Sequence, residues 1–375
     1  MIDRITRHLV HNRVQPGTAY PASAEAAEHH ALSHRLVAEM IDASPDEVVF
    51  GPSTTVNMFV LSHALRPWFA PGDEVIVTNL DHEANSGAWR RLAEIGVVVV
   101  EWRVDTASCD LEIADLEALL TERTRLVCFT HCSNVNGSIQ DVAAITRLVH
   151  DAGALVCVDA VAYAPHRRLD VKATDVDFYA FSLYKLYGPH IGVLYGKREH
   201  LLAAHSQNHY FFAEDQIPGK LTLGGYNHDI TCGPAGIIDY FDAVHAHHFP
   251  GSNADLRERL GEVFGLVAAH EETLATRLVD YLNSKPNVRI IGRPTGDPVL
   301  RAPIISFVVA GRSSADIVAG LLPHKVTVRE GDFYAARLIE ALGLADQDGV
   351  VRCSMVHYNT LDEVDRLIRG LDELL

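Results

Sequence analysis

The strongest constraint on the fold is the alternation of short apolar runs with helical patterns along the first half of the chain. Most of the apolar runs carry apolar residues at successive positions, which indicates strands that are buried on both faces. Such strands separated by helices predict an α/β domain with a mostly parallel sheet covered by helices. The runs lie at residues 48–50, 73–78, 96–102, 126–130, 154–158 and 178–181.

The pattern changes after residues 250–253, which read Pro-Gly-Ser-Asn. A long amphipathic helix is predicted over 255–282, and shorter, less regular strands and helices follow it to the end. This later part is typical of an α+β unit. We therefore expect a large α/β domain over residues 13–252 and a small α+β domain over residues 253–375, with residues 1–12 packed against the small domain.

Charge and composition exclude several classes of function. The chain has 375 residues, with 32 Lys and Arg against 49 Asp and Glu, a net charge of −17. A chain this acidic, without a basic patch, is not expected to bind nucleic acid. Its apolar runs are too short to cross a membrane, and no secretory signal opens the sequence. Six cysteines without Cys-x-x-Cys spacing fit a cytoplasmic protein with reduced thiols.

Polar residues gather where the predicted strands end. Asp159 follows one strand, Lys185 follows the next, and Asn134 follows an earlier one, while 53–55 (Ser-Thr-Thr) open a helix. Ligands of parallel sheets bind beyond the carboxyl ends of the strands, and helix N-termini favour phosphate. A lysine for a Schiff base, a carboxylate for a pyridinium nitrogen and an anion cradle are what pyridoxal phosphate needs. Each feature alone is common, and the order along the chain makes the combination informative.

The chain also resembles the fold-type I, class V aminotransferase family, and especially its cysteine desulfurases. The resemblance is carried by motifs in one order along most of the chain. They are Asp81-His82-Glu83-Ala84-Asn85 with Trp89, Ser133-Asn134-Val135, Val158-Asp159, His166, Asp170-Val171, Asp177-Phe178, Ser182-Leu183-Tyr184-Lys185-Leu186-Tyr187-Gly188-Pro189, Gly192-Val193-Leu194-Tyr195, and Arg352-Cys353-Ser354 with Tyr358-Asn359-Thr360.

This resemblance implies a role for each matching residue. Lys185 would carry the cofactor and move the substrate proton, Asp159 would pair with the pyridine nitrogen, and His82 would stack on the ring. Asn134 would hydrogen-bond the ring oxygen, and Arg352 would bind the substrate carboxylate, with Arg329 as a second cation. The residues implied at the cofactor phosphate are Ser53, Thr54, Thr55, Ser182 and Tyr184, while the loop that holds Gly225 is implied at the phosphate of the neighbouring subunit. The family also implies a homodimer.

Four positions depart from the family pattern. Tyr184 stands where the family usually carries a histidine. Tyr334 stands where desulfurases carry the cysteine that attacks the substrate sulfur, and a phenol does not form a persulfide. Ala162 replaces a glutamine that usually contacts the cofactor ring oxygen. Residues 224–227 resemble the family loop Gly-Thr-Pro-Asn, but Gly225 lacks the threonine hydroxyl.

These features predict a lyase that acts by β-elimination on a small L-amino acid carrying sulfur or selenium, with Tyr334 near the leaving group. Transamination and epimerisation are alternatives, since both use Lys185 and Asp159. A protein that binds pyridoxal phosphate without turnover is a further alternative. No metal site is expected, because no carboxylate or cysteine with ligand spacing accompanies the histidine groups 29–34 and 245–248.

Overall fold

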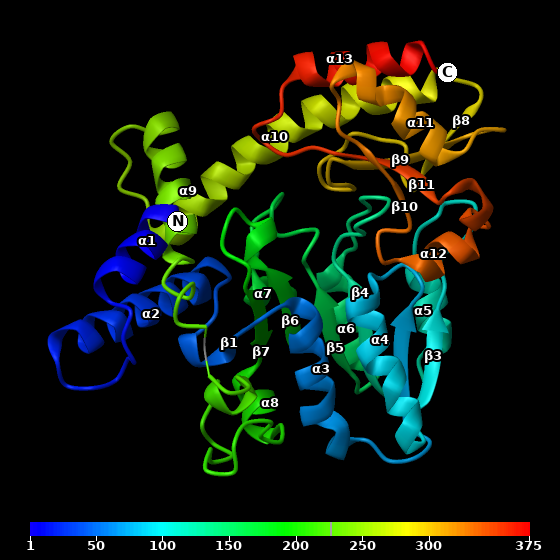
Figure 1. The fold of residues 1–375 in the computed structure, drawn as a ribbon. Helices are drawn as coiled ribbons and strands as arrows, with labels where there is room; N and C mark the ends of the chain where they lie inside the picture. The colour runs from blue at the N-terminus through cyan, green and yellow to red at the C-terminus, as the bar shows by residue number, and fades with distance from the viewer. Residues whose placement is uncertain (226) are drawn as a thin grey trace.

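A seven-stranded sheet forms the centre of the molecule (Figure 1). The structure, a computed structural model, describes residues 1–225 and 227–375. The strand order is β1-β7-β6-β5-β4-β2-β3, and the strands from β2 to β6 pair in parallel, whereas β7 is antiparallel to both neighbours. The strands are β1 (Val48–Gly51), β2 (Glu74–Thr78), β3 (Val98–Trp102), β4 (Thr124–Thr130), β5 (Leu155–Asp159), β6 (Phe178–Ser182) and β7 (Gly192–Gly196). The mostly parallel sheet is confirmed.

Each face of this sheet is covered by helices, as the apolar runs predicted. Within β5, Val156 and Val158 pack into the core cluster that includes α2 (Pro21–Met40) and α6 (Val142–Asp151). Cys157 points to the other face, into the cluster that holds residues of α3 and α4. Because both faces bury apolar side chains, the strand is apolar at successive positions. The helices on the second face are α3 (Thr54–Leu65) and α4 (Glu83–Arg90).

A smaller antiparallel sheet forms the C-terminal part of the molecule. Its strand order is β10-β11-β9-β8. It packs with α11, α13 and the second half of α10 into a separate core cluster, which contains Phe307, Leu278 and Leu367. The elements are β8 (Val288–Ile291), β9 (Ile304–Val309), β10 (Arg329–Gly331), β11 (Val350–Ser354), α10 (Leu256–Asn283), α11 (Ser314–Leu321) and α13 (Leu361–Asp372).

Helix α10 belongs to both parts. Its first half contributes Leu260, Phe264 and Val267 to the core of the large sheet, whereas Leu274 and Leu278 from its second half pack on the small sheet. One continuous helix therefore ties the small sheet to the large one (Figure 1).

The N-terminal helix lies elsewhere than expected. Helix α1 (Ile2–His11) packs on α2 and on the start of α9 (Ala235–His248), where Arg4 forms an ion pair of 2.5 Å with Asp239. A side chain at Gly236 would lie 2.3 Å from the Met1 Cα, so the absence of one allows this contact. The expectation that residues 1–12 pack with the C-terminal domain is wrong, because glycines in and before α9 open a docking surface on the large part.

The remaining helices are short. In the part of the chain that the structure describes, no helix combines the length and apolar character needed to cross a membrane. The short helices are α5 (Ile113–Leu119), α7 (Val171–Thr174), α8 (Arg198–Ala203) and α12 (Ala336–Ala341).

Candidate active site

A pocket opens at the carboxyl edge of the large sheet, where the polar strand ends were predicted to meet. It collects residues from the ends of β4, β5 and β6 and from the first turns of α3 and α4. Every residue predicted to bind the cofactor lines this pocket except Gly225. The lining consists of Ser53, Thr54, Thr55, His82, Ala84, Thr130, Cys132, Asn134, Asp159, Val161, Ala162, Ser182, Tyr184 and Lys185.

The first turn of α3 forms one end of the pocket. The Ser53 hydroxyl caps the helix by accepting a hydrogen bond of 3.2 Å from the Val56 N–H. The Thr54 Oγ1 lies 2.7 Å from the Ser182 Oγ, so two buried hydroxyls from α3 and β6 meet there. Backbone N–H groups at a helix N-terminus, together with hydroxyls and the helix dipole, favour a phosphate. This end of the pocket is suited to the cofactor phosphate.

Two ionisable groups also line the pocket, the buried Asp159 and the half-buried Lys185. Asp159 ends β5, and its Oδ1 accepts a hydrogen bond of 2.8 Å from the Val161 N–H. Burial raises the pKa of this carboxyl, while the nearby His82 and Lys185 lower it. Burial likewise lowers the pKa of the Lys185 amine, against the effect of Asp159. A desolvated lysine has a larger neutral fraction, which is the form that attacks an aldehyde.

His82 is fixed at the start of α4. Its Nδ1 accepts a hydrogen bond of 3.0 Å from the Ala84 N–H, so Nε2 carries the proton of the neutral ring. Burial lowers the pKa of this imidazole, which favours that neutral form. The His82 ring is therefore held as a flat wall of the pocket, and its centroid lies 5.3 Å from that of Tyr334.

The donor set fits pyridoxal phosphate. A hydroxyl-rich helix start accepts a phosphate, and a flat imidazole offers a stacking surface. A buried carboxylate beside a buried amine provides partners for a pyridinium nitrogen and an aldehyde. Asp159 is almost fully buried, and an uncompensated carboxylate is costly at such a depth. A cationic ring nitrogen would supply the missing charge.

The predicted substrate residues lie beside this pocket rather than in its lining. The Arg352 Nη1 donates a hydrogen bond of 2.7 Å to the backbone oxygen of Asn134. Burial and the neighbouring Arg329 lower the pKa of Arg352 to about 10. Tyr334 is 74% exposed at the mouth of the pocket, and Arg329 faces solvent on β10. The structure thus brings Arg352 and Tyr334 to the site and places Arg329 at its outer side.

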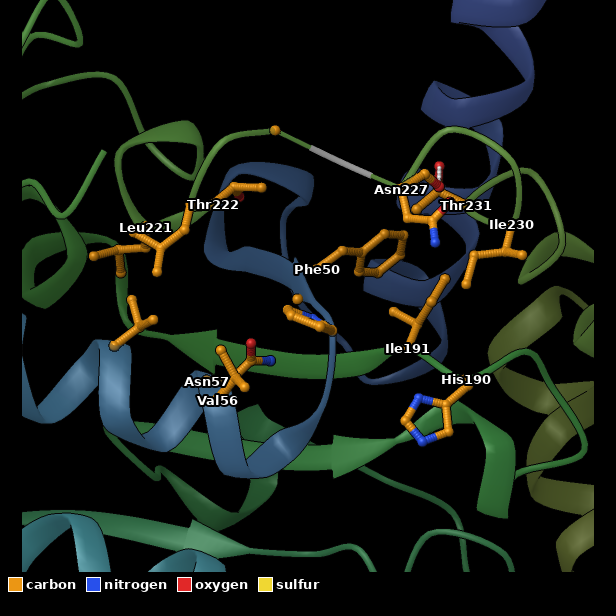
Figure 2. Close-up of a pocket in the computed structure, with 15 residues that line it drawn as sticks. Phe50, Val56, Asn57, His190, Ile191, Leu221, Thr222, Asn227, Ile230 and Thr231 are labelled. Carbon is orange, nitrogen blue, oxygen red and sulfur yellow. Dashed lines mark hydrogen bonds between the residues drawn. The ribbon is translucent and has the colours of Figure 1, made fainter. Parts of the chain in front are cut away.

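Tyr184 lies at the outer wall of the pocket, and Gly225 lies outside it. The Tyr184 ring stacks on His190, with centroids 4.6 Å apart, at the outer wall of the pocket. Gly225 lines a neighbouring cavity of about 370 Å³ with Asn57, Thr222 and His190 (Figure 2). The predicted contact of Gly225 is with the phosphate of the neighbouring subunit, and it stays a prediction; within its own chain the Gly225 loop runs along the outer side of α3. Tyr226, in the same predicted motif, lies outside the described residues.

Sequence reasoning missed three residues around the site. Thr130 ends β4 and lines the pocket, and the rule that found Asp159 would have found it too. Asp81 is buried behind His82 and accepts a hydrogen bond of 2.8 Å from the Asn85 Nδ2. The Phe333 ring lies against Arg352, 3.7 Å from ring centroid to guanidinium carbon. No local pattern marks Phe333, because the contact depends on how distant segments dock.

The cysteines are all buried. Burial raises the pKa of the Cys132 and Cys353 thiols to about 12. Cys132 lines the pocket but lies at its floor and is fully covered. A thiol kept protonated at this depth is a poor nucleophile. Tyr334 therefore stands at the mouth of the pocket without a reactive cysteine to replace it.

Comparison with known proteins gives a consistent result. The family described as Aminotransferase class-V matches residues 2–209 and 262–367. An aminotransferase-like protein, FGM3, of Gibberella zeae is 39% identical over 99% of this chain and 89% of its own length. The cysteine desulfurase-like protein ustD of Aspergillus flavus is 37% identical over 94% of this chain and 79% of its own.

Solved structures agree with the sequence relatives. The apo cysteine desulfurase of Thermococcus onnurineus superposes with a TM-score of 0.87 at 26% identity, over 100% of this chain and 90% of that one. The cysteine desulfurase CsdA of Escherichia coli gives a TM-score of 0.82 at 28% identity, over 100% and 91%. The chain therefore belongs to the class V aminotransferase, cysteine desulfurase-like family of fold-type I enzymes, which act with pyridoxal phosphate.

Proposed function

We propose that this enzyme is a lyase that removes a sulfur or selenium leaving group from a small L-amino acid by β-elimination, without a persulfide cysteine. The observation that carries the proposal is the composition of the site. The half-buried Lys185 lies near both the buried Asp159 and Arg352. The position at the mouth holds the phenol of Tyr334, while the thiols are buried. This set can ionise a substrate at Cα, but it offers no sulfur acceptor.

Each residue has a defined task in this reaction. Pyridoxal phosphate, when bound, supplies an electron sink for the pair released at Cα. The Lys185 amine takes the Cα proton, and Asp159 keeps the ring nitrogen protonated. Arg352 holds the substrate carboxylate with its forked N–H groups. The carbon–sulfur bond then breaks, and the Tyr334 hydroxyl protonates the departing sulfur.

The reaction balances with water as the only other reactant. L-Cysteine and one water would give pyruvate, ammonia and hydrogen sulfide. The ammonia carries the substrate nitrogen, and the proton that Lys185 removes from Cα is returned during release of the product. No oxidant, reductant or sulfur acceptor is required.

Product analysis tests this proposal. Cofactor-loaded protein is incubated with L-cysteine, L-selenocysteine and L-alanine, and the products are identified. Pyruvate and ammonia in equal amounts, from substrates with a leaving group only, are expected. Tyr334→Phe should lower the turnover number by about 10²- to 10⁴-fold, the range for loss of a general acid.

Other outcomes assign other reactions. A keto acid with the aminated cofactor would indicate transamination, and inverted substrate would indicate epimerisation. Wild-type turnover in Tyr334→Phe would remove the acid role of Tyr334. A loaded protein that leaves every amino acid unchanged would support binding without turnover.

We further propose that the enzyme works as a homodimer in the cytoplasm. Large apolar side chains stand exposed on the segment between β7 and α9, including Tyr210 at 99% and Phe211 at 65% exposure. Exposed apolar patches of this kind are typical of protein interfaces. The same segment continues to Gly225 and the cavity in Figure 2.

A further inference from the structure

Three residues from distant parts of the chain contact one another in a closed cycle beside the pocket. The Asn134 Nδ2 donates a hydrogen bond of 2.9 Å to the backbone oxygen of Phe333. The Phe333 ring covers the Arg352 guanidinium, at 3.7 Å from centroid to carbon. Arg352 returns a hydrogen bond of 2.7 Å to the backbone oxygen of Asn134. These contacts connect Asn134, which lines the pocket, to Arg352, the cation predicted to bind substrate.

The backbone at Phe333 is unusual. Phe333 and Tyr334 have φ angles of 53° and 62°, so two successive non-glycine residues adopt the left-handed region. That conformation costs free energy and persists where neighbouring contacts impose it. Here the Tyr334 backbone oxygen accepts a hydrogen bond of 2.8 Å from the Glu83 N–H, and the Asp332 Oδ1 accepts one of 2.8 Å from the Tyr334 N–H. The segment is thereby held against the start of α4.

Arg352 needs such support because another cation lies beside it. Arg329 on β10 is paired directly with Arg352 on β11, so both side chains leave the small sheet on the same face. Like charges directly opposite each other repel, so Arg329 pushes the Arg352 guanidinium away unless other contacts hold it in place. The negative face of an aromatic ring attracts a guanidinium, and stacking also fixes its plane.

We propose that Phe333 is a positioning residue for substrate binding: its ring holds the Arg352 guanidinium in the plane and direction that receive the substrate carboxylate. The inference rests on the proposed role of Arg352. It predicts that loss of the ring weakens binding of the carboxylate specifically. Binding of the substrate amine group and binding of the cofactor should not change when the ring is lost.

The test compares two amines that differ only in a carboxylate. L-Alanine and ethylamine are titrated into cofactor-loaded protein, and the change in visible absorption gives each dissociation constant. Phe333→Leu should weaken L-alanine by about tenfold, the loss expected for a partly desolvated cation–π contact. Ethylamine binding should not change. Phe333→Tyr, which keeps the ring face, should restore L-alanine binding.

Matched variants separate the possible failures. Phe69→Leu removes another half-buried ring, near the amino end of β2, and should change neither constant. Arg352→Lys should weaken L-alanine without affecting ethylamine. Suppose that Arg352→Lys weakens binding of L-alanine, but Phe333→Leu leaves that binding unchanged or weakens binding of both amines equally. The inference about Phe333 is then overturned, and the role of Arg352 stands. If L-alanine binds no better than ethylamine to the wild type, the proposed carboxylate site is itself wrong, and the inference falls with it.

Discussion

Buried ionisable residues define the chemistry of this site at the scale of single side chains. Lys185 and Asp159 both line the pocket, and the buried Asp81 accepts hydrogen bonds from Thr78 and Asn85. Burial, reinforced by Asp159, raises the pKa of Asp81 to about 7. Asp81 thus binds a proton readily and lies near Asp159, which must stay charged when the cofactor is bound.

Asp81 gives a stability prediction. Because its folded pKa lies above the unfolded value, the folded state binds this proton more tightly. The contribution of Asp81 to the free energy of unfolding of cofactor-free protein should therefore fall as pH rises from about 4 to about 7, and then level off. Asp81→Asn should remove this contribution, so the free energy of unfolding of the wild type minus that of Asp81→Asn should fall over the same range, as measured by urea unfolding at a series of pH values. Asp115→Asn, at an exposed position, is the control, and an equal slope in both variants would contradict the assignment.

At the scale of elements, the contact between β7 and α3 forms the phosphate end of the pocket. A side chain at Gly192 would lie 2.3 Å from the Ser53 carbonyl carbon and 2.6 Å from the Thr54 N. A glycine therefore lets the strand approach the first turn of the helix. The family motif that contains Gly192 has a steric explanation in this chain.

Gly192→Ala should consequently displace the first turn of α3. Overpacking of this kind costs roughly 1–3 kcal/mol, so we expect about tenfold weaker binding of pyridoxal phosphate, together with a loss of stability. Titration of cofactor-free protein with pyridoxal phosphate measures the affinity. Gly265→Ala, in α10 with open space around it, should leave the affinity unchanged. Wild-type affinity in Gly192→Ala would show that the turn tolerates the methyl group.

The elements also show what sequence could and could not predict. Lys185, Asp159 and Thr54 were placed together correctly, because strand ends and helix starts are local signals and parallel strands bring them to one edge. Strand β7 is not predicted from the sequence, because its apolar run between two glycines is only three residues long. The Phe333 stack on Arg352 depends on docking between the two sheets, which no short-range pattern encodes.

At the scale of the whole molecule, the site depends on both sheets. The large sheet provides the cofactor pocket, and the small sheet supplies Arg352 from β11. Helix α10 packs into both cores and so fixes their relative position. The N-terminal helix, by contrast, docks on α2 and α9, far from where its sequence position suggested. Its location depends on a docking surface formed more than 200 residues later in the chain.

The most direct test of this account asks which lysine carries the cofactor. The protein is loaded with pyridoxal phosphate, reduced with borohydride and digested, and the modified peptide is identified by mass spectrometry. Label is expected on Lys185 and not on Lys220, which is buried and donates hydrogen bonds to three backbone oxygens. Lys185→Ala should abolish both the visible absorption and the label. Label on another lysine, or unchanged absorption in Lys185→Ala, would contradict the central claim that this pocket is the cofactor site.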